Sequence, residues 1–360
     1  MGVYLGKNKV GMVKKFKGMD RLQWKCDNMK TLYFEFAYYT GTELSPVIEG
    51  LDTSNVTNFS YAFSSLSKLT SLDLSKFNTS SATNMSYMFY SSSKLADLNV
   101  STMNTSNVTT MSHIFDKCST LTKLDLSSWD VRKVDSMDYM FNACSKLSEL
   151  NWSNFDAEKA TTMAYMFYQC TGFQILDLSK LKSSTIKSMG AMFQGCSNVT
   201  KIDLSGLQQL KAQYFQNMFD SCTQLKEVVG CIDLEKASNV TSIVNKTGNL
   251  EKITFKNIKK ALTIGSGASY GANLTLDTLI NTIKELWDYS SGTTKYTLTM
   301  STASKELIAN TYVKLVDVTD EMLAADPNAA NKLPCVVCES TDEGAMLITS
   351  YATAKNWTIA

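Results

Sequence analysis

The sequence predicts an α/β solenoid, a repeat array of about eight 26-residue units with parallel strands and short helices, followed by a small α+β region. Three observations predict it. One residue pattern recurs every 26 positions, each repeat combines a strand-like with a helix-like spacing, and no proline interrupts the array.

The repeat is defined by apolar residues at fixed positions. Seven phenylalanines lie 26 residues apart, at Phe63, Phe89, Phe115, Phe141, Phe167, Phe193 and Phe219. Leucine, isoleucine or valine follows nine residues later, at Leu72, Leu98, Leu124, Leu150, Leu176, Ile202 and Val228. Seven repeats therefore run from Leu51 to about Gly230. A degenerate eighth, one residue shorter, places Val244, Leu250 and Ile253 in the same roles.

Each repeat contains two kinds of apolar spacing. The segment 121–126 alternates apolar and polar residues, which is typical of a half-buried strand. Met137, Met140 and Phe141 stand at i, i+3 and i+4, which predicts one face of a short helix. The Asn/Ser/Thr-rich segment 104–110 favours turns. One unit cannot bury its apolar side alone, so we expect the units to stack around a continuous core.

The array divides the chain into three predicted regions. Residues 1–50 precede the pattern and are expected to cap its first edge, with apolar residues at Val3, Leu5, Leu32, Phe34 and Phe36. Residues 51–258 form the array. Residues 259–360, called the C-terminal region below, are expected to cap or attach the other end. The three prolines lie outside the array, at Pro46, Pro327 and Pro334.

The C-terminal region carries a different pattern. A Gly/Ser-rich stretch at 265–271 marks a boundary, and residues 276–287 trace one helical face with Thr275 as N-cap. Further along, the pattern predicts strands at 296–300 and 313–316, a short helix at 306–308 and an extended segment at 332–338. A final helix is expected over 342–355, ending before Trp357.

Composition excludes several classes of function. Lys+Arg (35) nearly equal Asp+Glu (34), whereas nucleic-acid binding requires a basic excess. No apolar run reaches membrane-spanning length, so we expect no membrane insertion. The first eighteen residues show no signal-peptide pattern, which leads us to expect a protein made and kept in a cytoplasm.

Residues that suggest chemistry are better interpreted as packing positions. His113, the single histidine, occupies a repeat position that is tyrosine in neighbouring units. Five cysteines recur three residues after the phenylalanines, at Cys118, Cys144, Cys170, Cys196 and Cys222, which predicts free buried thiols. Cys335 and Cys338 have half the spacing of a zinc site, but the C-terminal region holds no histidine. We therefore predict no catalytic, cofactor-binding or metal site.

Two outward columns of the strands remain as a candidate interaction face. One column alternates Asp and Asn over its first rungs, and its neighbour carries mostly charged residues. The alternative interpretation is a solvated sheet face without a partner. The candidate residues are Asp97, Lys123, Asp125, Glu149, Asn151, Asp177, Lys201 and Asp203.

The repeat resembles the BspA-type leucine-rich repeat family. The segments that carry the resemblance are Leu51-Asp-Thr-Ser-Asn-Val-Thr-Asn, Asn84-Met-Ser-Tyr-Met-Phe-Tyr and Leu121-Thr-Lys-Leu-Asp-Leu-Ser. The resemblance covers roughly residues 51–258. It implies a leucine-rich-repeat-like fold and attachment to surfaces or partner proteins, and it carries no catalytic residues.

The two ends of the chain are similar to virion proteins of phages that infect gut bacteria. The similar segments are 3–10, 274–280 and 354–359. This resemblance implies a tail-associated virion component, assembled in the host cytoplasm, that contacts virion proteins or a host cell-surface protein or glycan. The alternatives are a virion scaffold or decoration protein without a receptor role, and a bacterial cell-surface adhesin.

Overall fold

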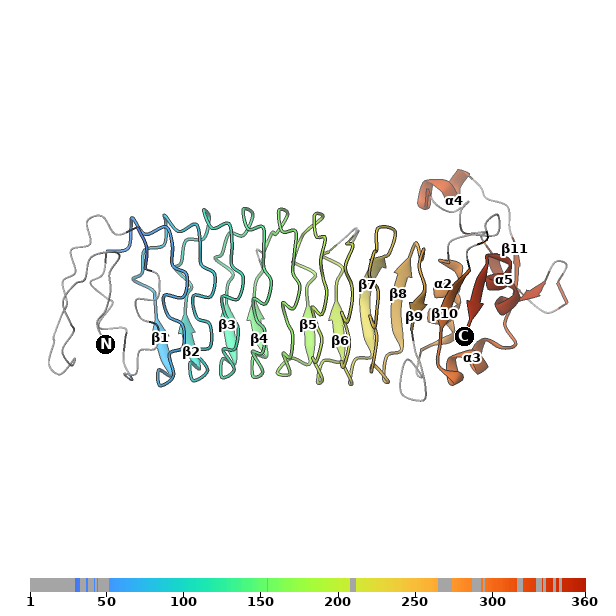
Figure 1. The fold of residues 1–360 in the computed structure, drawn as a ribbon, viewed down its shortest axis with the longest axis horizontal. Coiled ribbons are helices and arrows are strands. Elements are labelled where there is room, and N and C mark those ends of the chain that lie inside the picture. Colours follow the sequence, from blue (N-terminus) through green and yellow to red (C-terminus); the bar gives the residue numbers. More distant parts are fainter. Residues whose placement is uncertain are drawn as a thin grey trace. The chain divides into compact units, whose positions relative to one another are not determined.

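The computed structural model describes residues 30–32, 37, 42, 44, 52–153, 155–207, 212–264, 274–286, 293, 295–315, 320–327, 332, 335–338, 341–342 and 345–360. The chain folds as two compact units. Figure 1 labels the strands and helices described below. Unit 1 comprises Met1–Gln174 and Ser179–Ile186, and unit 2 comprises Ile175–Leu178 and Lys187–Ala360. Within the described residues, no helix is long and apolar enough to span a membrane.

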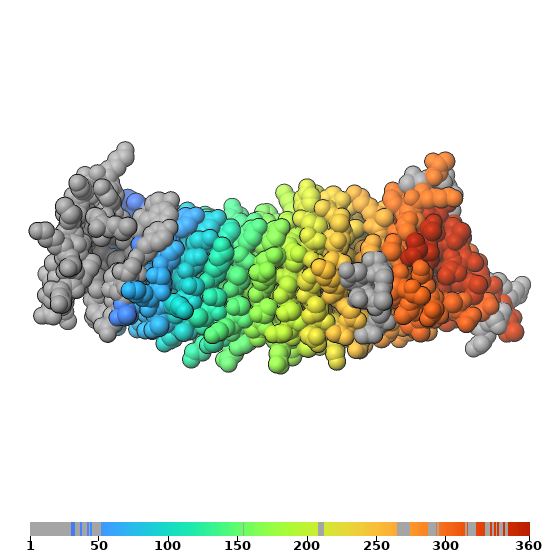
Figure 2. Space-filling view, turned by 60° about the horizontal axis from the view of Figure 1, so that its bottom comes forward, coloured from blue at the N-terminus to red at the C-terminus, as the bar shows by residue number. Residues whose placement is uncertain are grey.

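Unit 1 is a stack of coils joined by short parallel strands. Its strands are β1 (Ser71–Asp73), β2 (Asp97–Asn99), β3 (Lys123–Asp125) and β4 (Glu149–Asn151). β1 pairs with β2 and β3 with β4, each in a 26-residue register such as Leu72 opposite Leu98. A second ladder of single bridges runs from Thr31 through Asn58 and on to Thr162. In Figure 2, successive coils form adjacent bands from blue to green.

Unit 2 continues the repeat with a four-stranded parallel sheet in the order β5-β6-β7-β8. These strands are β5 (Ile175–Asp177), β6 (Lys201–Asp203), β7 (Glu227–Asp233) and β8 (Lys252–Lys256). β7 is longer because the register shifts between Glu227 and Cys231. Gly230 lies in this bulge at φ 96°, where a Cβ would meet the Leu204 carbonyl carbon at 3.1 Å.

The predicted eighth repeat is confirmed. Val244, Leu250 and Ile253 are buried, and Ile253 lies in β8. The parallel-strand solenoid and the 26-residue spacing are likewise confirmed in both units. A small α+β C-terminal region follows, as predicted.

Phenylalanine rings form the centre of the core. All seven repeat phenylalanines that the spacing identified, from Phe63 to Phe219, have no exposed surface. Within unit 1 consecutive rings stack at centroid distances of 5.8, 5.5, 5.7 and 5.3 Å, and in unit 2 Phe193 stacks on Phe219 at 5.6 Å. This ladder exists because each coil presents the same residue one strand spacing from the last.

The predicted short helices of the repeats are turns instead, and this corrects one detail of the fold. Tyr139 and Ala143 adopt left-handed backbone angles, φ 57° and 55°, which end any helical run. The backbone alternates between local and inter-coil hydrogen bonds. Asn142 N–H donates to Tyr139 O at 3.1 Å, whereas Phe141 N–H donates to Met166 O in the next coil at 2.9 Å. Because the next coil accepts every second N–H, a helix cannot form.

The five ladder cysteines are buried and form no disulfide, as predicted. The thiols of Cys118, Cys144, Cys170 and Cys222 each donate to a phenylalanine carbonyl in the preceding coil. Cys118 donates to Phe89 O at 3.1 Å, and Ser92 donates in the same way to Phe63 O at 2.8 Å. Burial raises the pKa of the Cys118 thiol, which is therefore neutral and unreactive.

The C-terminal region forms two three-stranded sheets and four short helices in the described residues. One sheet is parallel, in the order β14-β10-β9, with β9 at Leu262–Thr263, β10 at Tyr296–Thr299 and β14 at Trp357–Ile359. The other is antiparallel, in the order β12-β11-β13, with β11 at Tyr312–Leu315, β12 at Cys335–Cys338 and β13 at Met346–Leu347. The helices are α2 (Leu276–Lys284), α3 (Thr302–Ile308), α4 (Asp320–Ala325) and α5 (Ile348–Ala354).

Most elements predicted for this region are present. Thr275 caps α2, its side chain accepting from Thr278 N–H, as expected. The final helix begins at Ile348 rather than at residue 342, because residues 346 and 347 pair with β11 as a strand. The predictions for Val3, Leu5, Phe34, Phe36, Trp287 and the 265–271 stretch lie outside the described residues.

Candidate interaction surfaces

The Asp/Asn column of the strand face is used largely to hold turns. In unit 1, Asp73 Oδ1 accepts the Ser75 N–H at 2.9 Å and the Asn99 Nδ2 at 2.9 Å. Asp125 accepts the Ser127 N–H at 2.9 Å. These amide hydrogen bonds hold the pKa of Asp73 and Asp125 below the usual range. Both carboxylates are thus committed to the backbone, although they remain exposed.

The neighbouring column pairs opposite charges across strands. In unit 2, Lys201 Nζ lies 3.2 Å from Glu227 Oε2, and Lys252 Nζ lies 3.9 Å from Glu227 Oε1. In unit 1, Lys123 stands opposite Glu149 in the β3–β4 register. These pairs are exposed and weakly stabilising.

The structure places all eight predicted face residues on strands. Unit 1 holds Asp97, Lys123, Asp125, Glu149 and Asn151, and unit 2 holds Asp177, Lys201 and Asp203. Their side chains are exposed or half-exposed. Whether a partner binds them stays a prediction.

A second surface, which the sequence predictions missed, is a row of stacked aromatic rings in unit 1. We call it the aromatic strip, formed by Tyr61, Tyr87, His113, Tyr139 and Tyr165. Consecutive ring centroids lie 4.4, 4.2, 4.4 and 4.5 Å apart, and the planes differ by 8° or less. All five side chains are half-buried. The ring faces are therefore covered by each other, and the ring edges remain accessible.

The backbone fixes these rings. Each strip residue has left-handed angles, with φ between 57° and 60°. Such a conformation is costly for a large side chain and persists only where surrounding contacts determine it. Here the recurring contact is a backbone hydrogen bond to the next coil, such as Tyr139 N–H to Ala164 O at 3.0 Å. In unit 2, Ala191 and Asn217 keep the same angle and the same bond without a ring.

Two further tyrosines and a lysine widen the strip. Tyr90 packs edge-on against Tyr87 at 5.6 Å, and Tyr168 lies 5.6 Å from Tyr165. The Lys117 ammonium lies 5.2 Å from the Tyr90 ring centroid and donates to its hydroxyl at 3.1 Å. That hydrogen bond raises the pKa of Lys117. Tyrosine edges and hydroxyls of this kind are enriched at protein interfaces.

His113 is a packing residue, as predicted, with a polar partner beneath it. Its Nδ1 lies 2.7 Å from Asp116 Oδ2, and the other Asp116 oxygen accepts Asn142 Nδ2 at 2.8 Å. Asp116 is only 3% exposed, so these bonds replace its lost hydration. Burial raises the pKa of nearby Asp138, although Thr162 and the Ala164 N–H donate to it.

A sequence signal for the strip existed. Tyrosine or histidine stands two residues before the phenylalanine in five consecutive repeats. In unit 2 the same position holds Ala191 and Asn217, so no aromatic strip continues there. The column was interpreted as a packing position. A buried and a half-buried aromatic column have the same 26-residue period, so the sequence alone does not distinguish them.

The described residues contain no group of three or more His, Cys, Asp or Glu side chains placed to hold a metal ion. Cys335 lies in β12, is buried and is in no disulfide. Burial raises the pKa of Cys231 to about 11, so this thiol is protonated at neutral pH.

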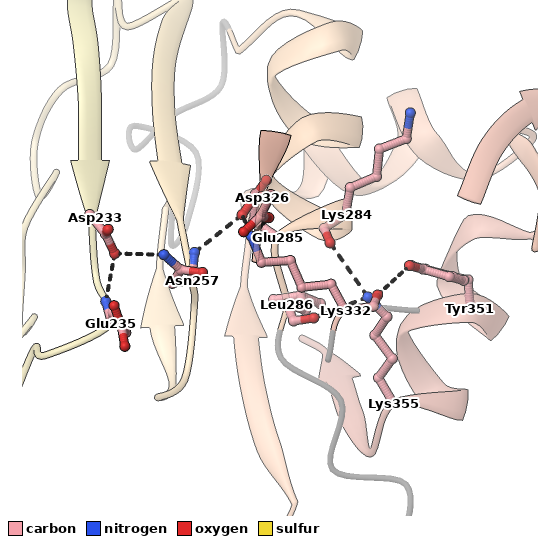
Figure 3. Close-up of polar contacts among 10 residues, drawn as sticks. All are labelled: Asp233, Glu235, Asn257, Lys284, Glu285, Leu286, Asp326, Lys332, Tyr351 and Lys355. Carbon is pink, nitrogen blue, oxygen red and sulfur yellow. Dashed lines mark hydrogen bonds and ion pairs between the residues drawn. The ribbon is translucent and has the colours of Figure 1, made fainter. Parts of the chain in front are cut away.

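Within unit 2 a buried polar network joins the last strands of the array to the C-terminal region (Figure 3). The Lys332 ammonium, 6% exposed, lies 2.5 Å from Glu285 Oε2 and 2.6 Å from Asp326 Oδ2. Glu285 also accepts the Asn257 N–H at 3.2 Å, and Asn257 Nδ2 donates to Asp233 Oδ1 at 2.8 Å. Burial lowers the pKa of Lys332, but the two carboxylates offset this and raise it above its usual value.

A second buried lysine holds the end of α2. Lys355 has no exposed surface, and its ammonium donates to Leu286 O at 3.0 Å and Lys284 O at 3.4 Å. It also lies 4.4 Å from the Tyr351 ring centroid, and the Tyr351 hydroxyl donates to Lys332 O at 2.8 Å. A cation at carbonyls that end a helix is favourable, so this contact positions α2.

Parallel three-residue strands, repeated every 26 residues around a phenylalanine ladder, define a solenoid of leucine-rich-repeat-like type. The family model described as "Mycoplasma protein of unknown function, DUF285" matches residues 7–99, 92–201 and 149–257. These matches together cover more than half of the chain, and the chain belongs to this family.

Among solved structures, the chain is similar to a leucine-rich repeat protein from Bacteroides ovatus ATCC 8483, with 13% sequence identity and a TM-score of 0.23. The similarity covers 56% of this chain and 64% of that chain, which is less than two thirds of its length. At that score the fold assignment rests on the strand register alone. A comparison with curated proteins gave no match.

Proposed function

We propose that the protein is a non-enzymatic interaction protein that binds a protein partner through the aromatic strip of unit 1. The observation that carries the proposal is the row of five stacked, half-exposed rings from Tyr61 to Tyr165. A leucine-rich-repeat-like fold typically serves as an interaction scaffold rather than as a catalyst.

The geometry of the strip favours a protein over a glycan. Sugars bind aromatic side chains mainly through the ring faces, and here each inner ring is covered on both faces by its neighbours at 4.2–4.5 Å. What remains is a row of ring edges and hydroxyls, already ordered by stacking. Binding to such a surface loses little side-chain entropy, as in tyrosine-rich protein interfaces.

The biological setting we propose is a phage virion, with the protein as a tail-associated component that contacts the host surface or a neighbouring virion protein. The similarity of segments 274–280 and 354–359 to phage virion proteins supports this setting. The family description names Mycoplasma and gives no function. A bacterial cell-surface adhesin is the first alternative. A virion scaffold or decoration protein is the second alternative.

Fractionation and competition separate these settings. Mass spectrometry of purified virions is expected to detect the chain, and the purified full chain is expected to coat host cells and compete with infection. Detection in virions without competition would favour the scaffold or decoration role. Detection on the surface of phage-free cells would instead establish the adhesin and overturn the virion setting.

Substitution tests the strip itself. Tyr87→Asn together with Tyr139→Asn is expected to weaken partner binding by about tenfold or more, because hot-spot tyrosines lie at the centre of interfaces. Asparagine tolerates the left-handed backbone and stands at this repeat position in unit 2 as Asn217. The matched control is Lys123→Ala with Glu149→Ala on the strand face. If only the control lost binding, the partner would bind the strand face instead.

A further inference from the structure

The C-terminal region of unit 2 contains a pocket of about 290 Å³ that none of the preceding surfaces includes. Four segments line it: the residue before β10, α3, α5 and the turn into β14. Six of the eight lining residues are polar or charged, namely Lys295, Lys305, Thr349, Thr353, Asn356 and Thr358. Trp357 and Ile359 add apolar surface.

The backbone explains why these side chains meet. β10 and β14 are parallel, with Tyr296 opposite Trp357 and Thr297 opposite Thr358, so Lys295 and Asn356 precede the same pair. Asn356 adopts φ 62° and turns the chain from α5 directly into β14. That turn brings Thr349 and Thr353, one helical turn apart on α5, to the side of the strand pair.

The pocket has an unbalanced positive charge. Two ammonium groups line it, and among the described residues no acidic side chain does. Neither Lys295 nor Lys305 forms an ion pair within the described part of the chain. The buried lysines of the same region contrast with them, because Lys332 is held by two carboxylates and Lys355 by two carbonyls. Two exposed ammonium groups that lack an acidic partner among the described residues, beside hydroxyl donors, favour an anion.

We propose that this pocket binds a monosaccharide-sized ligand through an oxyanion group, such as a phosphate or a carboxylate. Lys295 and Lys305 hold the oxyanion, and the hydroxyls of Thr349 and Thr358 donate to it or to ring hydroxyls. The volume is near the lower end of small-ligand pockets, which suits one sugar unit better than a longer chain. Ile359, which is half-buried, provides the apolar surface against which the sugar ring lies, whereas Trp357 is only 1% exposed and belongs to the core behind the pocket.

Calorimetric titration of the full chain tests the proposal with four probes: glucose 6-phosphate, glucuronate, glucose and inorganic phosphate. We expect at least one of the two charged sugars to bind with a Kd near 1 mM or tighter. Uncharged glucose is expected to bind at least about tenfold more weakly, because it lacks the oxyanion. Raising the ionic strength is expected to weaken the binding of the charged sugar, because both lysines are exposed.

Lysine substitutions identify the site. Lys295→Met with Lys305→Met is expected to reduce the affinity for the charged sugar by about tenfold or more. Lys226→Met, an exposed lysine of unit 2 outside the pocket, removes a charge elsewhere and is expected to leave affinity unchanged. Circular dichroism checks that each variant is folded. Thr358→Val, a smaller change, tests whether the hydroxyl contributes.

Three outcomes would overturn the proposal. The first is that neither charged sugar shows binding at a concentration about ten times the expected Kd. The second is that glucose binds as tightly as the charged sugars. The third is that the double lysine variant binds the charged sugar as tightly as the Lys226→Met control does. If inorganic phosphate matches glucose 6-phosphate, the sugar part is wrong and the site is a simple oxyanion site. None of these results bears on the aromatic strip, which lies in unit 1.

Discussion

In the repeat coils, the polar side chains that bond across coils find their partner 24 to 29 residues along the chain. In the C-terminal region the corresponding partners are 47 to 71 residues apart, as for Lys332 with Glu285 and Lys355 with Lys284. The coils repeat hydrogen bonds in which neither partner, or only one, carries a charge. The C-terminal region uses two buried ammonium groups instead. Repetition therefore spreads stability over many equal contacts, whereas the C-terminal region concentrates it in a few.

The largest expected effect breaks the core of the coils. Phe141→Ala removes a fully buried ring that stacks on Phe115 and Phe167 at 5.7 and 5.3 Å. We expect it to lower the free energy of unfolding by about 4 kcal/mol, because a cavity remains between two coils. Urea denaturation followed by circular dichroism measures the loss. Phe141→Leu is the milder control, and an equal loss from both would show that volume is not the cause.

Next in size is the removal of the charged centre of the C-terminal region. Lys332→Met leaves Glu285 and Asp326 without their cation, and we expect a loss of about 3 kcal/mol. The estimate is at the lower end for buried pairs because the Asp326 side chain is 37% exposed. Denaturation monitored by tryptophan fluorescence checks it.

A compensating variant sharpens this prediction. Replacing all three residues, as Lys332→Met with Glu285→Gln and Asp326→Asn, removes the unpaired charges and is expected to recover most of the loss. A triple variant no more stable than Lys332→Met would mean that the lysine acts through its packing rather than its charge.

A smaller effect is expected at the strip. His113→Tyr restores the tyrosine of the neighbouring coils but removes the group bonded to buried Asp116. We expect a loss of about 2 kcal/mol, because the carboxylate keeps only its bond from Asn142. His113→Tyr with Asp116→Asn is expected to be close to the parent in thermal denaturation. If His113→Tyr alone were neutral, stacking would outweigh the hydrogen bond.

The smallest effect is a pH dependence from the Asp column. Asp73 and Asp125 have folded-state pKa values below the usual 3.8. Their stabilising contribution is therefore complete above pH 3.8 and is lost as the pH falls through the lowered folded-state values. NMR titration of the carboxyl carbons is expected to give midpoints below 3.8 for both. Ser127→Pro, which removes the amide donor to Asp125, is expected to raise only that midpoint. Ser127→Ala removes the smaller contribution of the hydroxyl and is expected to raise the same midpoint less.

The two regions also differ in what their sequences predicted. The spacing of Phe63 to Phe219 predicted the coil, its core and the shortened eighth repeat, because each repeat position has one environment. It failed on the short helices, since Tyr139 and Ala143 have left-handed angles that the Met/Phe spacing does not reveal. In the C-terminal region local signals such as Thr275 predicted helix and strand. These local signals could not predict that Lys332 pairs with Glu285, because the C-terminal region has no sequence repeat to indicate which distant residues meet.

The candidate sites followed the same rule. The eight strand-face residues were placed correctly on strands, because alternation determines which side chains point outward. The aromatic strip was visible as a column, but its exposure depends on the backbone angle. The pocket between Lys295 and Lys305 arises from the β10–β14 register, which short elements do not predict.

The buried thiols give five consecutive coils, those of Cys118 to Cys222, a reporter of local opening. A thiol reagent can attack only after a coil opens, because every repeat cysteine is buried and burial raises the pKa of Cys118, Cys144 and Cys222. Labelling rates at single cysteines, read by mass spectrometry, would thus report the opening free energy coil by coil. The native cysteines therefore allow local opening along a repeat array to be measured without introducing any substitution.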